Sequence, residues 1–342
     1  MAKRTLCIPA AAINGFNYQP GYSSCTFETW RCYDPAVFRR ELSRGKDLFP
    51  KMNAVRIWLS WNAWCRGPER FLGHVGQTLD ICGELGLKVV PVLFNRWHDP
   101  MLDCDGIYMD HFIPKSSWLL KYGLPGMDFV RDMGRVFASD QRILAWDLCN
   151  EPFVYRTAAE FPHSEEFTRY EQDWLRQVAA RLEENGITQP VGVGTWGPAC
   201  DPLVDEFADV FMTHLYLTMP GNEPCRVLPP EKVAEYEETV RGAAEYAAKA
   251  GKPIMTTEIC WGSFDDASRV LLIEHNVRIC RKYGLGIFAY ALYESDFADL
   301  HRPEQGRLSP DIGHLEFIRR DGTLRPGHDI INRFFDSVLK DD

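Results

Sequence analysis

The chain has 342 residues, of which 45% are hydrophobic, 13% aromatic and 25% charged, which is ample for a large globular core. Its net charge of −10 argues against a nucleic-acid partner, because phosphate recognition needs a basic surface. No apolar run approaches the ~18 residues of a membrane span, so we expect no membrane partner.

Strand-like and helix-like segments alternate along the chain without a linker or a low-complexity stretch. Asp34 and Pro35 are typical of the N-cap and first residue of a helix, and Gly86 is typical of a helix end. In the first half, we expect strands over 12–18, 54–59, 87–94 and 143–149, and helices over 35–49, 69–85 and 126–138.

The second half has the same alternation and closes with a turn and a helix. The predicted strands are 191–195, 210–215, 254–257 and 287–292, and the predicted helices are 165–184, 202–207, 230–250 and 267–283. A hairpin is expected around Asp321-Gly322, followed by a last helix over 328–339.

Strands that are apolar on both faces and alternate with helices indicate a parallel sheet. Eight such units favour a closed (β/α)8 TIM barrel over a doubly wound open sheet. The first strand is also not followed by the Gly-x-Gly-x-x-Gly turn of a dinucleotide-binding fold. We therefore expect a single α/β domain over 1–342, with residues 310–342 packed on the barrel.

Two glutamates stand at the ends of apolar runs: Glu151 after 143–149 and Glu258 after 254–257. Reactive residues of a TIM barrel lie at the carboxyl ends of its strands, so both glutamates are expected on one rim. Two carboxyl groups facing one cleft are what cleavage of a glycosidic bond requires. Further polar and aromatic residues at predicted strand ends are Asn95, Trp97, His98, Trp196, His214, Tyr216, Trp261, Tyr290 and Glu294.

The segment Trp146-Asp147-Leu148-Cys149-Asn150-Glu151-Pro152 resembles the strand-four signature of the retaining glycoside hydrolases of clan A, which include glycoside hydrolase family 5. The resemblance implies that Glu151 is the general acid/base and that Asn150 hydrogen-bonds the sugar 2-hydroxyl. Thr257-Glu258 is similar to the end of strand seven in that clan, which implies that Glu258 is the nucleophile.

The same resemblance extends to other strands. It implies that Arg56 supports the nucleophile and that Tyr216, in the pair His214 and Tyr216 of a His-x-Tyr motif, hydrogen-bonds it. Either Asn95 or His98 fills the polar position of strand three. The implied activity is hydrolysis of β-linked glycosides or short oligosaccharides with retention of configuration, without a cofactor or a metal.

One feature departs from the clan, in which a tryptophan commonly ends strand eight beneath the sugar. Here Tyr290 or Tyr293 replaces it, or Trp261 reaches across. The aromatic-rich segment 96–125 is long for a loop in a compact domain, so we expect it to wall the cleft and to define subsites.

Three alternatives to this activity stay open. An endo-acting β-glucanase or β-mannanase would use the same two carboxylates on a polysaccharide. A non-catalytic carbohydrate-binding barrel is disfavoured by the intact Glu151 and Glu258. A metal-dependent barrel hydrolase is disfavoured because no His-x-His follows the first strand. The expected partner is a carbohydrate substrate, and the sequence leaves the oligomeric state open.

The eleven cysteines contain no Cys-x-x-Cys pair, which favours reduced thiols over a zinc ribbon or a redox motif. Cys149 and Cys260 lie two residues from a glutamate on the same strand, so we expect them inside the barrel. The N-terminus has charges but no sustained apolar segment, which predicts a cytoplasmic protein. Cys25 and Cys32 are close enough in sequence to form a disulfide if the protein is exported.

Overall fold

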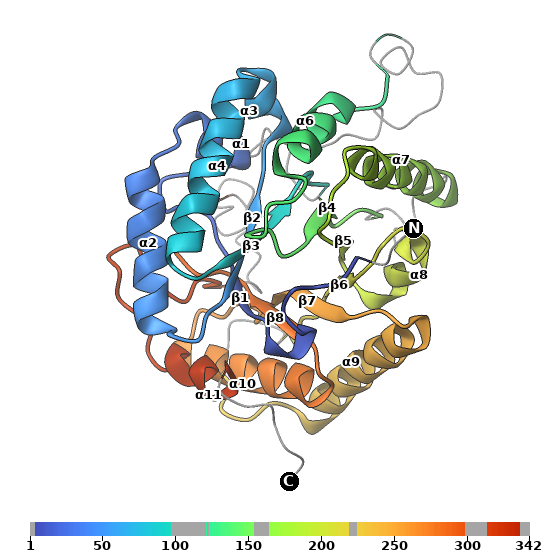
Figure 1. The fold of residues 1–342 in the computed structure, drawn as a ribbon. Helices are drawn as coiled ribbons and strands as arrows, with labels where there is room; N and C mark the ends of the chain where they lie inside the picture. The colour runs from blue at the N-terminus through green and yellow to red at the C-terminus, as the bar shows by residue number, and fades with distance from the viewer. Residues whose placement is uncertain are drawn as a thin grey trace.

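The computed structural model describes residues 4–96, 121, 123–153, 164–218, 224–297 and 313–335. Eight parallel strands form a closed barrel in the order β1 to β8, surrounded by helices (Figure 1). The strands are β1 (Asn14–Asn17), β2 (Ala54–Trp58), β3 (Lys88–Val92), β4 (Trp146–Asn150), β5 (Val191–Thr195), β6 (Phe211–His214), β7 (Ile254–Ile259) and β8 (Gly286–Ala289). The predicted TIM barrel is confirmed.

The helices of the outer layer follow the strands in the expected alternation. They are α2 (Pro35–Leu48), α4 (Pro68–Glu84), α6 (Met127–Phe137), α7 (Ser164–Glu184), α8 (Asp201–Val204), α9 (Pro230–Ala250) and α10 (Asp266–Lys282). The Asp34 carboxylate accepts hydrogen bonds from the backbone N–H groups of Ala36 and Val37, as an N-cap does. Gly251 ends α9 in a left-handed conformation at φ 66°.

Short helical segments at both rims of the barrel were not expected from the sequence. These are η1 (Ala10–Ala12), α1 (Thr26–Arg31), α3 (Trp61–Cys65) and η3 (Pro198–Cys200). Each has at most six residues, which is too short for helical periodicity to stand out. Cys25 and Cys32 flank α1 at its two ends and are not bonded to each other.

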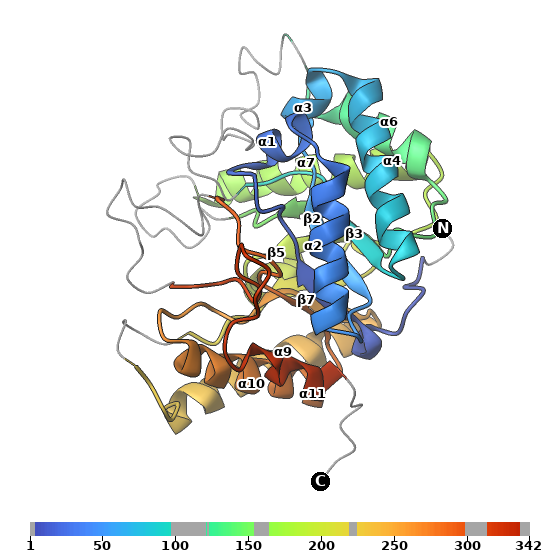
Figure 2. The same cartoon turned by 90° about the vertical axis from the view of Figure 1, so that its left-hand side faces the viewer.

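The C-terminal segment packs against α10, beside the barrel (Figure 2). An antiparallel bridge between Ile318 and Leu324 encloses the predicted turn at Gly322. The predicted last helix is a 3-10 turn, η5 (His328–Ile331), followed by α11 (Asn332–Phe335). Its expected continuation to residue 339 lies outside the described residues. None of the helices in the described ranges is long and apolar enough to cross a membrane.

The barrel interior is filled in two layers. At the amino-terminal end, side chains from alternate strand positions form a closed apolar cluster that includes Ala54, Val90, Met255 and Phe288. Their sequence neighbours, such as Val55 and the other outward-facing residues, join the larger core between strands and helices. Toward the carboxyl ends of the strands, beyond this apolar cluster, the barrel interior is lined by polar side chains. This polar layer forms the floor of the cavity described below.

Two strands carry an extra residue relative to their neighbours near that floor. The register shifts in β4 between Asp147 and Asn150, against β5, and in β7 between Thr256 and Ile259, against both β6 and β8. A bulge changes which face a side chain occupies. Cys149 and Cys260 consequently pack in the core outside the barrel, so the prediction that they fill its interior is wrong.

Candidate active site

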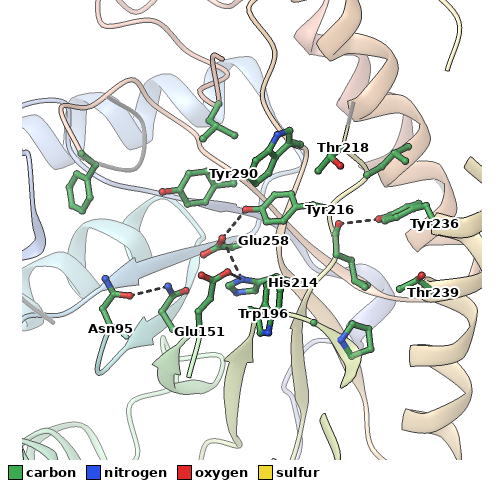
Figure 3. Close-up of a pocket in the computed structure, with 18 of the residues that line it drawn as sticks. Asn95, Glu151, Trp196, His214, Tyr216, Thr218, Tyr236, Thr239, Glu258 and Tyr290 are labelled. Carbon is green, nitrogen blue, oxygen red and sulfur yellow. Dashed lines mark hydrogen bonds and ion pairs between the residues drawn. The ribbon is translucent and has the colours of Figure 1, made fainter. Parts of the chain in front are cut away.

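A cavity of about 720 Å³ opens at the carboxyl ends of the strands. Glu151 and Glu258 line it together with His214, Tyr216 and Tyr290, and Figure 3 shows these side chains converging. In six of the eight strands, the last residue either lines the cavity or is adjacent in sequence to a residue that lines it. The cavity therefore lies where the reactive residues of TIM barrels are found.

Arg56 lies in the middle of the polar layer beneath the cavity, and its side chain is fully buried. Its Nε donates to Asp147 Oδ2 at 2.9 Å, and its Nη2 donates to Asn150 Oδ1 at 2.7 Å. Its Nη1 donates to Glu258 Oε1 at 2.7 Å and to Asn17 Oδ1 at 3.1 Å. One guanidinium thus joins β1, β2, β4 and β7. Its planar fork suits this task better than a lysine ammonium.

The bulge in β4 explains how one strand reaches Arg56 twice. Asp147 and Asn150 are three residues apart, so regular alternation would turn them to opposite faces. Asp147 Oδ1 also accepts from the backbone N–H of Gly194 at 2.8 Å, which ties β4 to β5. A methyl group on Gly194 would lie 2.7 Å from Asp147 Oδ2 and from Arg56 Nη2, so only glycine fits here.

Glu258 has both carboxylate oxygens hydrogen-bonded. Oε1 accepts from Arg56, and Oε2 accepts from the Tyr216 hydroxyl at 2.8 Å. Burial raises the pKa of Glu258, and His214 and Arg56 oppose that rise. Burial also raises the pKa of Tyr216 well above its usual range, so this hydroxyl stays a donor.

Glu151 faces Glu258 across His214. His214 Nδ1 lies 2.8 Å from Glu151 Oε1 and 3.5 Å from Glu258 Oε2. One carboxylate oxygen of each glutamate and one nitrogen of His214 all lie within 4.8 Å of one another. Burial lowers the pKa of His214 to about 4, so the imidazole is neutral near pH 7. Register places His214 beside Glu258 in the sheet.

These three side chains are also the described residues whose donor atoms are close enough together to hold a metal ion. The surroundings fit a metal poorly, because Arg56 and Tyr216 already donate to both oxygens of Glu258. A guanidinium 2.7 Å from a ligand oxygen would also repel a cation.

The structure brings most of the other sequence-predicted residues to the same cavity. Asn95, Trp196, Trp261 and Tyr290 line it, and Asn95 Oδ1 accepts from Asn150 Nδ2 at 3.0 Å. Trp196 is 46% exposed, so its ring is accessible from the cavity. Trp97 and His98, and most of the predicted cleft wall, lie outside the described residues.

Two candidates at strand eight lie elsewhere. Glu294 accepts the backbone N–H of Arg320 at 3.0 Å and does not line the cavity, so its predicted substrate contact is not supported. Tyr293 is buried beside the C-terminal segment, where it bridges to Ile318. Of the two tyrosines, only Tyr290 reaches the cavity, where its hydroxyl accepts from Gln19 at 3.1 Å.

Three site residues were missed by sequence reasoning, namely Gln19, Trp58 and Asp147. Asp147 had a signal: a carboxylate within an otherwise apolar strand needs a buried partner, and Arg56 was the available cation. Trp58 gave no such signal, because its contacts with Arg56 and Tyr290 depend on the barrel closing.

Two carboxyl groups that face one cavity are what cleavage of a glycosidic bond requires. The sequence model of the cellulase family, glycosyl hydrolase family 5, matches residues 47–295. The chain therefore belongs to glycosyl hydrolase family 5. A comparison with curated proteins found no match.

Solved structures with the same fold include three glycoside hydrolases. GH5_18 from Streptomyces cattleya in complex with GlcNAc has a TM-score of 0.64 at 14% identity, over 94% of this chain and 80% of that one. The endo-1,4-β-mannanase from Rhizomucor miehei has a TM-score of 0.59 at 14% identity, over 96% and 100%. A broad-specificity endoglucanase from Clostridium longisporum has a TM-score of 0.66 at 13% identity, over 97% and 99%.

Proposed function

We propose that this family 5 protein is a retaining β-glycoside hydrolase in which Glu258 is the nucleophile and Glu151 the general acid/base. The observation that carries the proposal is the close approach of the two carboxyl groups, whose nearest atoms lie within 4.8 Å. Retaining enzymes separate these groups by ~5–5.5 Å, whereas inverting enzymes leave ~6.5–9.5 Å for a water molecule.

In the first step, an oxygen of the Glu258 carboxylate attacks the anomeric carbon as the bond to the leaving oxygen breaks. Glu151 gives its proton to that oxygen, so the aglycone departs as a neutral alcohol. Arg56 and Tyr216 hold the attacking carboxylate in place and favour its ionised form. His214 is neutral and leaves this proton on Glu151.

In the second step, Glu151 is ionised and accepts a proton from water. The water oxygen attacks the same anomeric carbon, and the ester bond to Glu258 breaks, which returns the carboxylate. Two inversions give net retention. Asn150 is held by Arg56 and Asn95 with its side chain at the cavity wall, which suits a hydrogen bond to the sugar 2-hydroxyl.

For the substrate, we propose β-linked glycosides or short oligosaccharides. Tyr290 takes the place of the strand-eight platform, and Trp196 and Trp261 offer further ring faces to a sugar. The second candidate is endo-action on a β-glucan or β-mannan, which is favoured by the resemblance of the fold to an endo-mannanase and an endoglucanase. Product profiles from cello- and manno-oligosaccharides distinguish exo- from endo-cleavage.

The test uses Glu258→Ala and Glu151→Ala on a panel of 4-nitrophenyl β-glycosides. Glu258→Ala should lose turnover, and azide should restore it by giving a glycosyl azide of inverted configuration. With Glu151→Ala, azide should instead give the retained product, because Glu258 still attacks first. The matched control is Glu294→Ala, which should keep activity because its side chain lies outside the cavity. Undiminished turnover in both single variants would sink the assignment.

A further inference from the structure

The segment that carries Glu151 has an unusual backbone. Glu151 lies at φ 48° and Phe153 at φ 67°, so two non-glycine residues within three adopt the left-handed conformation. Such residues are uncommon, and they persist only where the surrounding structure holds them. The direction of the Glu151 side chain therefore depends on what fixes this turn.

Two hydrogen bonds fix the turn from outside. The backbone N–H of Glu151 donates to the carbonyl of Gly194 at 2.7 Å, which ties the turn to β5. The backbone N–H of Phe153 donates to Glu171 Oε2 at 2.9 Å, which ties it to the middle of α7. Phe153 itself is completely buried, so the end of the turn is anchored by packing as well.

The other oxygen of Glu171 pairs with Arg96 Nε. Both side chains are 2% exposed, so the pair is shielded from water and from salt. Arg96 follows Asn95, and its backbone N–H donates to the carbonyl of Asn150 at 3.0 Å. The buried pair therefore links the end of β3, the turn after β4 and helix α7.

We propose that Arg96 and Glu171 are positioning residues that hold the Glu151 turn in the orientation needed for proton transfer to the leaving group. This inference rests on the proposed role of Glu151 as acid/base. Neither residue touches the cavity, and both act through the backbone on either side of Glu151. The turn needs such support, because Glu151 and Phe153 adopt a left-handed backbone conformation that is costly for residues other than glycine.

The test compares kcat/KM for two aryl β-glycosides of the sugar that the panel identifies. Phenoxide needs a proton as it leaves, whereas 2,4-dinitrophenoxide does not, and kcat/KM reports the first chemical step for both. Glu171→Gln should lower kcat/KM about 100-fold for the phenyl glycoside, the scale of a small misplacement, and only about threefold for the dinitrophenyl glycoside. A purely structural role would lower both values equally, which would overturn the inference.

Two further variants distinguish a loss of positioning from a general loss of folding or stability. Arg96→Met combined with Glu171→Gln removes both charges, so neither member of this pair is left buried without the other, and we expect the double variant to fold where a single variant fails. It should show the same preference for the dinitrophenyl glycoside. Glu183→Gln is the matched control, because it lies on the same helix, pairs with Arg4 and is remote from the turn. It should leave the ratio of the two values unchanged.

Glu151→Ala separates this inference from the proposed function. If it lowers kcat/KM equally for both substrates, Glu151 is not the acid, and the proposed function fails first. If Glu151→Ala is selective for the dinitrophenyl glycoside but Glu171→Gln and the double variant are not, the positioning role alone is refuted.

Discussion

Arg56 is the residue whose removal tests the site most directly. Its guanidinium makes four hydrogen bonds to four different side chains, and none of its surface is exposed. We consider two substitutions. Arg56→Met removes the charge and every donor, whereas Arg56→Lys keeps the charge but offers three donors from a single point.

The expected cost follows from the burial of the partners. Asp147 is 0% exposed and Glu258 is 7% exposed, so Arg56→Met leaves two carboxylates without their cation. Breaking a buried ion pair in this way lowers the free energy of unfolding by about 3–5 kcal/mol. In a chain of this size, that corresponds to a fall in Tm of about 4–7 °C. Arg56→Lys should lose less, because the positive charge is retained.

Substitution of Arg56 should also affect activity, because Arg56 influences whether the Glu258 carboxyl group is ionised. Arg56 favours the ionised carboxylate, so without it the pKa of Glu258 rises further above its usual value. The first chemical step needs ionised Glu258. The acidic limb of the pH profile of kcat/KM should therefore move to higher pH, by about 1–3 units for Arg56→Met and by less for Arg56→Lys.

The assay is a pH profile with a dinitrophenyl glycoside, beside a thermal melt of each variant. The control is Arg281→Met, which removes another buried arginine at the opposite end of the barrel, where it bonds the carbonyls of Ala11 and Ile13. This control should lower Tm and leave the acidic limb in place. If Arg56→Met lowers Tm without moving the limb, the reasoning about Glu258 is refuted.

Three further predictions concern single side chains at the cavity. Tyr216→Phe removes one donor from Glu258 and should lower kcat about 10-fold while changing Tm little, because a single hydrogen bond contributes ~1 kcal/mol; an unchanged kcat would contradict this. Trp196→Ala should raise KM about threefold to tenfold without lowering Tm, because the ring is 46% exposed; a large fall in Tm would instead show a packing role. His214 has a folded pKa of about 4, below its unfolded value of ~6.5, so the stability it contributes is present at neutral pH and is lost as pH falls from about 6.5 to 4. His214→Asn should therefore show a smaller loss of Tm than the wild type over that interval.

The barrel was predictable because local signals agree with the whole fold. Apolar runs of strand length alternate with amphipathic helices, and glycines such as Gly86 and Gly251 end helices in the left-handed conformation. The two glutamates were predictable for the same reason, since each ends such a run. The contacts of Arg56 and Tyr216 with Glu258 agree with those that the family resemblance implied.

What the sequence did not predict depends on register. The rule that alternate residues share a face places Cys149 beside the residues inside the barrel, and it fails because β4 is bulged between Asp147 and Asn150. A bulge depends on how two strands pair, so one strand alone gives no sign of it. Glu294 was misplaced for a related reason: the chain leaves the barrel at Ala289, which is earlier than the predicted end of the strand.

In the proposed mechanism, the net charge of the buried cluster around Arg56 is the same before reaction and in the glycosyl-enzyme. Before reaction, Arg56 balances Asp147, Glu258 is ionised and Glu151 carries a proton, so the cluster holds one net negative charge. In the glycosyl-enzyme, Glu258 is an uncharged ester and Glu151 is ionised, so the net charge is the same. His214 is neutral before the reaction, because burial lowers its pKa to about 4. A buried site whose net charge does not change needs little reorganisation of its surroundings during turnover. Asp147 sets the value of that charge, because it balances the Arg56 guanidinium in both states. The bulge in β4 turns Asp147, together with Asn150, toward Arg56.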